Sequence, residues 1–511
     1  MVQMSRRDFV KVTGTGLALA TLPGFIRSGF AGVGAGAGDN PYNFYFQRFG
    51  IDEDMIRKVM AEALHYGGDY CDLFFQNELS NSIRLQDNIV NSASTNVTLG
   101  VGIRVLNGNQ TGYSFTEDIS LASMKAAART AAGIASGSAK AAPQTFNATK
   151  LMNYYETEIS YEDVGVKDKV DMLQAINDDV FKQDARVVKA NVNFSDSENY
   201  ILVVNSEGGI ASDYQPMLRI SVGCTAEEDG KRENNYFDYS VRDDINFLTE
   251  EKLKRLPREA VARTVKLFEA QTPPAGEMPV VLAAGSSGIL LHEAIGHGME
   301  ADFNRQGISV FSDMINKKVA EDFVTIVDNG TNPHVRGSIN VDDEGHPSEE
   351  TQLVENGVLR SYIHDRISAK HYGVDPTGSG RRESFKHYPL PRMRNTYMKN
   401  GPHTFDEIIA NVKYGIVAEQ FTNGQVNIGP GDFTFYVKSG SLIEDGKITG
   451  LIKDVNIIGN GPEVLSRVTM VANDMKMAEG GWTCGKNGQS VPVSMGLPSV
   501  LVSSITVGGR G

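Results

Sequence analysis

Residues 290–300 read Leu-Leu-His-Glu-Ala-Ile-Gly-His-Gly-Met-Glu, and they carry two histidines and a glutamate in one predicted helix. The helix is predicted to follow a buried strand, because residues 279–284 are the apolar run Pro-Val-Val-Leu-Ala-Ala. A turn at Gly285-Ser-Ser-Gly288 connects the two. Two imidazoles suit a zinc ion, and a neighbouring carboxylate suits the activation of water. This stretch is therefore the candidate centre of chemistry.

The spacing of the two histidines, His292 and His297, is unusual for a helical metal site. At about 100° per residue, positions i and i+4 lie about 40° apart around a regular helix, whereas i and i+5 lie about 140° apart. Both rings can face one ion only if the helix widens locally, as it does in a π-turn. Gly296 is a residue that tolerates such a distortion. Two helix-surface histidines with unrelated partners are the alternative interpretation.

The chain before the predicted strand contains both helical and strand patterns, as a mixed α/β domain does. Helical periodicity is present near residues 52–66, 119–135, 164–184 and 248–268, whereas alternating or β-branched runs predict strands within 72–105 and 187–239. The clearest linker signal is Thr272-Pro-Pro-Ala-Gly276. We therefore predict an N-terminal mixed α/β domain with antiparallel strands over residues 38–275.

The chain after residue 304 is predicted to be rich in β-structure. Turns of the Asn-Gly or Asp-Gly type, which are typical of hairpins, begin at residues 329, 356, 423, 445 and 487. We predict a C-terminal β-rich domain over residues 276–511, a β-sandwich or layered sheet that carries the metal-binding helix. The fold class expected for the whole chain is α+β.

The composition excludes several classes of protein. With 41% hydrophobic and 22% charged residues among 511, the chain is neither disordered nor a multi-span membrane protein. The net charge of −14 argues against binding to nucleic-acid phosphates. Three cysteines cannot form a disulfide framework. Cys71 and Cys224 look structural, and whether they pair with each other is left open.

The N-terminal residues 1–37 resemble a twin-arginine export signal. Arg6 and Arg7 precede a moderately apolar stretch, Val12 to Ile26, which is too short to span a bilayer comfortably. Small residues around Ala37 supply a cleavage site. This pattern predicts an exported, periplasmic protein without a stable membrane span.

The segment 285–312 resembles the TldD/PmbA family of metalloproteases, specifically its catalytic TldD type. The similarity continues in Arg336-Gly-Ser-Ile-Asn-Val-Asp-Asp-Glu-Gly345, Pro391-Arg-Met-Arg-Asn-Thr-Tyr-Met398 and Cys484-Gly-Lys-Asn-Gly-Gln-Ser-Val-Pro-Val493. It extends, more weakly, into the N-terminal half, and so covers nearly the whole chain after residue 37.

The resemblance implies a zinc ion held by His292, His297 and Cys484, with Glu293 as the general base that activates water. Three protein ligands leave a fourth position open, as in catalytic rather than structural zinc sites. The implied substrates are peptides or unfolded protein segments, and the implied assembly is a homodimer or a heterodimer with a related subunit. The alternative for Cys484 is a small apolar core residue.

Further residues are candidates for supporting roles. Arg381 and Arg382 could hold a peptide carboxylate or backbone, with surface loop arginines as the alternative. Glu300 and Asp302 could orient a ligand histidine, or they could be solvated carboxylates at a helix end.

Two other functions compete with a zinc peptidase. One is a non-catalytic regulatory partner subunit of a TldD-like complex, which the presence of all four centre residues counts against. The other is a metal hydrolase that acts on a non-peptide amide.

Overall fold

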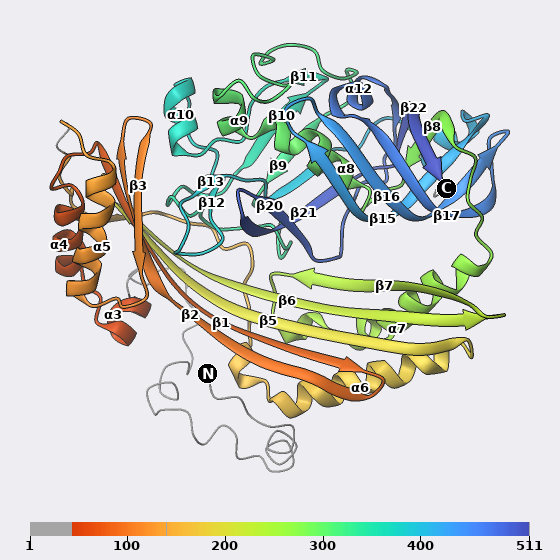
Figure 1. Ribbon diagram of the computed structural model, residues 1–511, viewed down its shortest axis with the longest axis horizontal. Coiled ribbons are helices and arrows are strands. Elements are labelled where there is room, and N and C mark those ends of the chain that lie inside the picture. Colours follow the sequence, from red (N-terminus) through yellow and green to blue (C-terminus); the bar gives the residue numbers. More distant parts are fainter. Residues whose placement is uncertain (1–42, 139–140, 510–511) are drawn as a thin grey trace.

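The computed structural model describes residues 43–138 and 141–509, and its N-terminal part is built on one long, twisted sheet (Figure 1). The seven strands are β1 (Tyr70–Gln86), β2 (Ile89–Asn107), β3 (Gln110–Thr116), β4 (Asn147–Ala148), β5 (Val187–Asn205), β6 (Gly209–Glu228) and β7 (Lys231–Val241). The order is β3-β2-β1-β5-β6, with β4 and β7 both paired to β6, and every pairing except β4–β6 is antiparallel.

One face of this sheet is apolar and is covered by helices. The alternation along β1 places Leu73, Phe75, Ile83 and Leu85 on that face, where all four are buried. The covering helices are α4 (Glu53–Ala63) and α5 (Leu121–Ile134) at one end, and α6 (Val166–Gln183) and α7 (Glu250–Val265) at the other. A short helix, α3 (Asn43–Phe49), packs beside the first pair.

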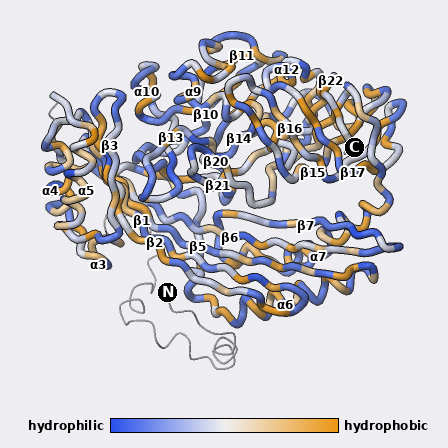
Figure 2. The backbone as a smooth tube through the Cα atoms, in the orientation of Figure 1, coloured by the Kyte–Doolittle hydropathy of each residue, from blue (hydrophilic) through white to orange (hydrophobic). Residues whose placement is uncertain are grey.

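The opposite face of the sheet is turned toward the C-terminal part of the chain (Figure 1), and Figure 2 shows hydrophilic and hydrophobic residues interspersed along the strands. Ser82 of β1 lies between Ser94 of β2 and Ser195 of β5, and Ser195 in turn pairs with Arg219 of β6. Cross-strand neighbours share a face, so hydroxyl, amide and charged groups extend across four strands.

The C-terminal part contains two larger sheets and a two-stranded ribbon. The first sheet comprises β9 (Ile326–Asn329), β10 (Glu350–Glu355), β11 (Val358–Leu359), β14 (Asn395–Met398), β19 (Lys476–Met477), β20 (Trp482–Lys486) and β21 (Gln489–Leu497). The second comprises β8 (Gly276–Leu282), β15 (Tyr414–Asn427), β16 (Asp432–Glu444), β17 (Lys447–Asn460), β18 (Val468–Val471) and β22 (Val500–Gly509). Because β17 also pairs with β22, the second sheet closes on itself. The ribbon pairs β12 (Gly380–Arg381) with β13 (Leu390–Pro391).

A helical segment that begins with α8 (Gly288–Leu291) lies between the two larger sheets. It contacts β14 and β21 of the first sheet, and its continuation contacts β15 and β16 of the second. Ile289, Leu290 and Ile295 belong to the apolar core that both sheets share. The remaining helices are short and lie around this core: α9 (Ala301–Arg305), α10 (Arg366–Tyr372), α11 (Phe405–Ala410) and α12 (Gly461–Ser466).

The predicted α+β class is confirmed: a mixed N-terminal part with antiparallel strands precedes a β-rich C-terminal part that holds the histidine-bearing helix. The division between residues 275 and 276 stays a prediction. The predicted signal at residues 1–37 lies outside the described residues. None of the helices described is long and apolar enough to cross a membrane.

A buried ion cluster joins the N-terminal sheet to the C-terminal part. Arg104 of β2 donates through Nε to Asp72 Oδ2 of β1 at 2.7 Å, and its Nη1 lies 2.7 Å from Glu344 Oε1. Arg104 and Asp72 are almost completely buried. Charges removed from water in this way stabilise the fold only while they remain paired.

Replacing Arg104 with Gln should leave buried Glu344 without its ion-pair partner and buried Asp72 with the longer pair to Arg382, at 3.5 Å. Loss of one partner of a buried pair costs about 3–5 kcal/mol, so the midpoint of thermal unfolding should fall by several degrees. Lys254→Ala is the matched control, because Lys254 pairs with Glu250 on the exposed surface of α7 and its loss should change the midpoint little. An unchanged midpoint in Arg104→Gln would show that the cluster does not stabilise the contact between the two parts.

Candidate metal centre

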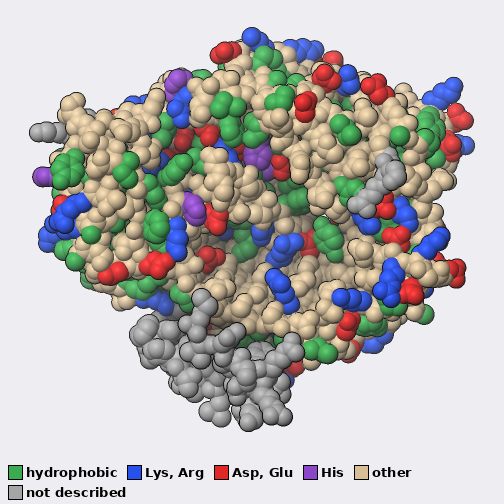
Figure 3. All heavy atoms as spheres, viewed as in Figure 1, with side chains coloured by type: hydrophobic (Ala, Val, Ile, Leu, Met, Phe, Trp, Pro, Cys, Tyr) green, Lys and Arg blue, Asp and Glu red, His purple; other side chains and the backbone are tan. Residues whose placement is uncertain are grey.

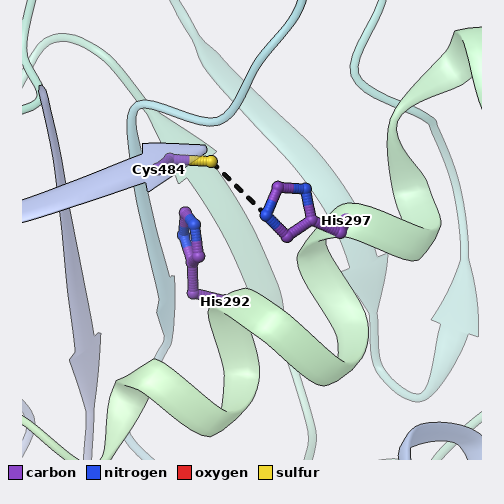
Figure 4. Close-up of side chains that lie close together, drawn as sticks. All are labelled: His292, His297 and Cys484. Atoms are coloured by element: carbon purple, nitrogen blue, oxygen red, sulfur yellow. Dashed lines mark hydrogen bonds between the residues drawn. The ribbon is translucent and has the colours of Figure 1, made fainter. Parts of the chain in front are cut away.

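Three predicted ligands converge in the core of the C-terminal part (Figure 4). His292 and His297 project from the helical segment and Cys484 from β20. One ligand atom from each residue lies within 4.8 Å of the others, and Cys484 Sγ lies 3.4 Å from His297 Nε2. All three side chains are buried. Among the residues that the structure describes, no other group of three or more such side chains converges in this way.

A π-helical turn brings the two histidines onto the same side of the helix. Residues His292–Gly296 form this turn, η5, and the backbone N–H of His297 donates to the carbonyl of His292. The bond from i+5 to i widens the helix by one residue per turn. A short 3₁₀ turn, η6 (His297–Met299), follows. The prediction that the spacing requires a π-turn is confirmed.

Gly296 contributes to this turn through its size rather than through its backbone freedom. Its backbone is ordinary right-handed helix, with φ −61° and ψ −48°. A Cβ atom at this position would overlap Met393 Sδ. Gly461, the first residue of α12, is required for the same reason, because its Cβ would overlap the carbonyl oxygen of Ala294. The close approach of neighbouring elements therefore holds the widened helix in place.

Glu300 and Lys486 form a chain of charges behind His297. Glu300 Oε2 lies 2.9 Å from His297 Nδ1, which leaves Nε2 facing Cys484. Lys486 Nζ lies 3.1 Å from Glu300 Oε2 and 2.7 Å from Asp302 Oδ1. Burial raises the pKa of Glu300, but Lys486 and His297 together bring it down to about 2. The carboxylate is therefore ionised and orients the imidazole, as acidic partners of metal-bound histidines do.

The charge favoured at Cys484 and the surroundings of His292 suit a metal ion. Burial raises the pKa of the Cys484 thiol, yet His297 and His292 lower it well below its ordinary value. Both ring nitrogens of His292 are buried, and neither has a hydrogen-bond partner in the described part of the chain. A buried imidazole without a partner is costly unless something binds it. Two nitrogens and one thiolate within a few ångströms are a ligand set typical of zinc.

Glu293 lies at the edge of this centre. Its Oε2 is 3.7 Å from His297 Nε2, and its side chain retains 24% exposure whereas the ligand side chains are buried. A carboxylate in this position can reach both the centre and a molecule that approaches from solvent.

The other candidates divide between the centre and its surroundings. Glu300 contacts a ligand histidine, whereas Asp302 contacts Lys486 instead. Arg381 and Arg382 are buried rather than on a surface loop, and they line a cavity beside β20. The three cysteines are all free, so Cys71 and Cys224 are not paired.

Two residues near the centre were missed by the sequence analysis. Lys486 lies two positions after Cys484, so both side chains point to the same side of β20, and this spacing was the available signal. Arg392 donates from Nη2 to the carbonyl oxygen of Cys484 at 2.5 Å. Nothing in its local sequence indicates this contact, because the two residues are 92 positions apart.

Comparison with known proteins identifies the family. Models of the PmbA/TldA metallopeptidase match at residues 71–135 (domain 1), 159–268 (central domain) and 275–509 (C-terminal domain). The chain belongs to the PmbA/TldD family. It is 38% identical over 448 residues to the metalloprotease TldD homolog of Buchnera aphidicola subsp. Acyrthosiphon pisum, an alignment that covers 86% of this chain and 93% of that protein.

Two further relatives support a metalloprotease. The TldD homolog of Haemophilus influenzae is 39% identical and aligns over 87% of this chain and 94% of its own length. The zinc metalloprotease TldD homolog of Saccharolobus solfataricus is 33% identical, over 62% of this chain and 65% of its own length. The names of these relatives support a peptidase function that depends on a metal.

Solved structures of the PmbA/TldD fold match the whole architecture. A Thermotoga maritima protein proposed to modulate a DNA gyrase matches with a TM-score of 0.73 at 22% identity, over 89% of this chain and 100% of that one. TldE from Thermococcus kodakarensis matches with a TM-score of 0.71 at 17% identity, over the same shares. At these identities the likeness shows the fold alone.

The prediction of export to the periplasm is wrong. The relatives that the chain matches over most of its length are named as metalloprotease TldD homologues, and none of these comparisons points to the twin-arginine pathway. Paired arginines before a short apolar stretch are a compositional pattern of only a few residues, and such a pattern also occurs in segments that direct no export.

Gly296→Ala should damage the centre by forcing Met393 or the helix to move. Overpacking of this kind costs about 1–3 kcal/mol, and the displaced π-turn should also reduce zinc content after purification. The double variant Gly296→Ala with Met393→Ala should recover part of the zinc content, since it removes the obstructing sulfur.

Gly133→Ala in α5 is the control, because nothing lies within 4 Å of the added Cβ there. It should leave zinc content and thermal stability unchanged or slightly improved. Full zinc content in the Gly296→Ala single variant would show that the turn does not depend on this contact.

Proposed function

We propose that this chain is a zinc-dependent peptidase that hydrolyses peptide bonds in peptides or unfolded protein segments. The observation that supports this most strongly is a buried donor set of His292, His297 and Cys484 beside the partly exposed carboxylate of Glu293. The metalloprotease names of the relatives, one of them a zinc metalloprotease, agree with it.

His292, His297 and Cys484 are the proposed zinc ligands. The bound ion would supply Lewis-acid polarisation of the scissile carbonyl and would make water a stronger nucleophile. His297 is positioned for this role by Glu300, because a hydrogen bond to Nδ1 leaves Nε2 directed at the centre. Three protein ligands leave room for water or substrate.

Glu293 is the proposed general base. Its carboxylate would accept a proton from the attacking water and then return it to the nitrogen of the departing amine. The distance of 3.7 Å between Glu293 Oε2 and His297 Nε2 puts the carboxylate near the position where that water would be held. Its partial exposure lets substrate reach the same point.

Arg381 and Arg382 remain the proposed contacts to substrate. Arg381 donates to the main-chain oxygens of Met393 and Pro492, and Arg382 to those of Asp343 and His387. Both residues line a cavity beside the strand that carries Cys484. This location supports a role in holding a peptide, since the cavity and the centre share a wall.

The assembly that we propose is a dimer, with an identical subunit or with a related one. The structural likeness to TldE supports the related-subunit form. Of the alternative functions, a regulatory subunit has no need of a preserved ligand set and general base. A hydrolase of non-peptide amides would use the same centre, so the substrate assay decides between it and a peptidase.

Glu293→Gln should abolish the hydrolysis of unfolded casein while leaving about one zinc per chain. The amide can still form hydrogen bonds but cannot take a proton, and general-base catalysis typically contributes a factor of roughly 10²–10⁴ in rate. Casein cleavage and metal analysis on the same sample measure both quantities. Glu321→Gln is the control: it makes the same chemical change at a glutamate whose side chain is half exposed, and it should behave like the parent. Undiminished casein cleavage in Glu293→Gln would refute the role as base.

Cys484→Ser should strongly lower the zinc content, because a hydroxyl is a much poorer zinc ligand than a thiolate. Metal analysis after dialysis against a weak chelator is the measurement. Cys224→Ser makes the same chemical change at another buried cysteine, and it should retain the parent zinc content. Equal zinc in both variants would return Cys484 to the role of a core residue.

A further inference from the structure

A cavity of roughly 290 Å³ lies between the polar face of the N-terminal sheet and the β20–β21 hairpin. Four arginines line it: Arg242, Arg336, Arg381 and Arg382. Lys and Arg side chains gather in the hollow between the two parts of the molecule in Figure 3. The cavity adjoins the metal centre, because Thr483 and Val491 line it and are the chain neighbour and the cross-strand partner of Cys484.

Arg242 is buried, and among the described residues its side chain forms no hydrogen bond or ion pair, although Asp213, Glu78 and Asp343 attract it from beyond ion-pair distance. Its side chain is only 2% exposed, and within the described residues its guanidinium has no hydrogen-bond acceptor and no carboxylate oxygen within 4.0 Å. The Arg242 guanidinium makes a cation–π contact with Tyr155, and 5.3 Å separates Arg242 Cζ from the centroid of that ring. Leaving a charged group buried and unpaired is costly, so a site with this feature is suited to a negative ligand.

Arg336 and Arg381 donate their hydrogen bonds to neutral groups. Arg336 donates to Ser240 Oγ at 2.7 Å and to the carbonyl of Trp482 at 2.9 Å. Arg381 donates to two main-chain carbonyls. Burial, together with Arg219 and Arg242, lowers the pKa of Arg336 to about 10, and burial with Arg242 lowers that of Arg381 to about 9. The guanidiniums therefore repel one another, and an anion between them would relieve the repulsion.

The carboxylates of the same wall attract these three arginines, but among the described residues none of them forms an ion pair with Arg242, Arg336 or Arg381. Glu78, Asp343 and Glu383 line the cavity, but Asp343 accepts the backbone N–H of Arg382 and Glu383 accepts that of Ser490. Burial raises the pKa of both Glu78 and Asp343, whereas Arg242 acts on both in the opposite direction. Among the described residues, Arg382 is the one of these four arginines that has an ion-pair partner, Asp72 at 3.5 Å.

We propose that this cavity binds the carboxylate of a peptide ligand, with Arg242 and Arg336 as the residues that select it. Carboxylates suit guanidinium groups, which present planar arrays of donors to them. This inference rests on the proposed peptidase function, and it deepens it: peptides that carry a carboxylate at the right distance from the scissile bond are preferred. The carboxylate is that of the C-terminus or of an acidic side chain.

The test is the binding of three N-acetylated nonapeptides of Ala, Ser and Gly to the zinc-loaded Glu293→Gln chain, measured by calorimetry. One peptide has a free C-terminus, one has a C-terminal amide, and one has the amide with a single internal glutamate. We expect the free acid to bind roughly tenfold tighter than the plain amide, as charge-assisted hydrogen bonds typically provide. A gain confined to the glutamate peptide assigns the carboxylate to a side chain instead.

Arg242→Gln and Arg336→Gln should each remove most of the difference between these peptides. The measured quantity is the ratio of peptide affinities within one variant. A general loss of fold lowers all the affinities together and therefore leaves this ratio unchanged. If one of the two variants fails to fold, the other still tests the proposal. Arg84→Gln is the control, since it removes an exposed charge from the same sheet outside the cavity and should keep the ratio.

The two proposals fail in different ways. Equal affinities for the three peptides, or a ratio that survives in both arginine variants, overturns the carboxylate site and leaves casein cleavage by the parent chain untouched. Absence of casein cleavage by the parent, with the peptide preference intact, overturns the peptidase and leaves the carboxylate site.

Discussion

The metal centre depends on one extra residue in a helical turn. A spacing of five places His292 and His297 on different sides of a regular helix, and only the π-turn over His292–Gly296 brings them together. A widened turn is not stable by itself, so neighbouring elements must hold it. Met393 and α12 approach so closely that a Cβ atom at position 296 would overlap Met393 Sδ and one at position 461 would overlap the carbonyl oxygen of Ala294. The centre is thus a property of the packing around the helix as much as of the helix itself.

Buried charged groups form a continuous series of contacts that ends at this centre. Lys486 stabilises ionised Glu300, Glu300 orients His297, and His297 together with His292 favours the thiolate of Cys484. Each group therefore favours the charge or orientation of the next, and the three proposed ligand atoms already lie close together. Such preorganisation lowers the reorganisation that binding and catalysis require. Glu293 stays outside this chain of contacts and keeps access to solvent.

The polar face of the long N-terminal sheet is turned toward the C-terminal part of the chain. Its apolar face is covered by four helices, so the opposite face is free to form one wall of the space beside β20. The buried pairing of Arg104 with Asp72 and Glu344 connects that sheet to the C-terminal part. The arginines that line the cavity come together at this junction, because residues from both parts of the chain contribute to its wall.

The sequence alone determined much of what is local in this protein. Apolar periodicity predicted the helices near α4 to α7, and the His292–His297 spacing required a π-turn, because each signal lies within a few residues. Turn dipeptides correctly predicted the hairpins at residues 356, 445 and 487, but the predicted turn at 423 lies within β15, and the one at 329 ends β9 without forming a hairpin. The role of Cys484 came from resemblance, since nothing local connects residues 187 positions apart. The N-terminal pattern at residues 1–37, which lies outside the described residues, gave a wrong prediction of export, because so short a pattern also occurs in segments that direct no export.

Only the tertiary structure decided which distant groups meet. It brought Cys484 to the histidines, placed Lys486 behind Glu300, and moved Arg381 and Arg382 from an expected surface loop to a buried wall. It also buried Arg242 with no hydrogen-bond or ion-pair partner for its side chain among the described residues, a property that no sequence pattern reports. The physical reason is that burial and electrostatic pairing depend on the sum of contacts from several elements, whereas periodicity and spacing record only neighbours along the chain.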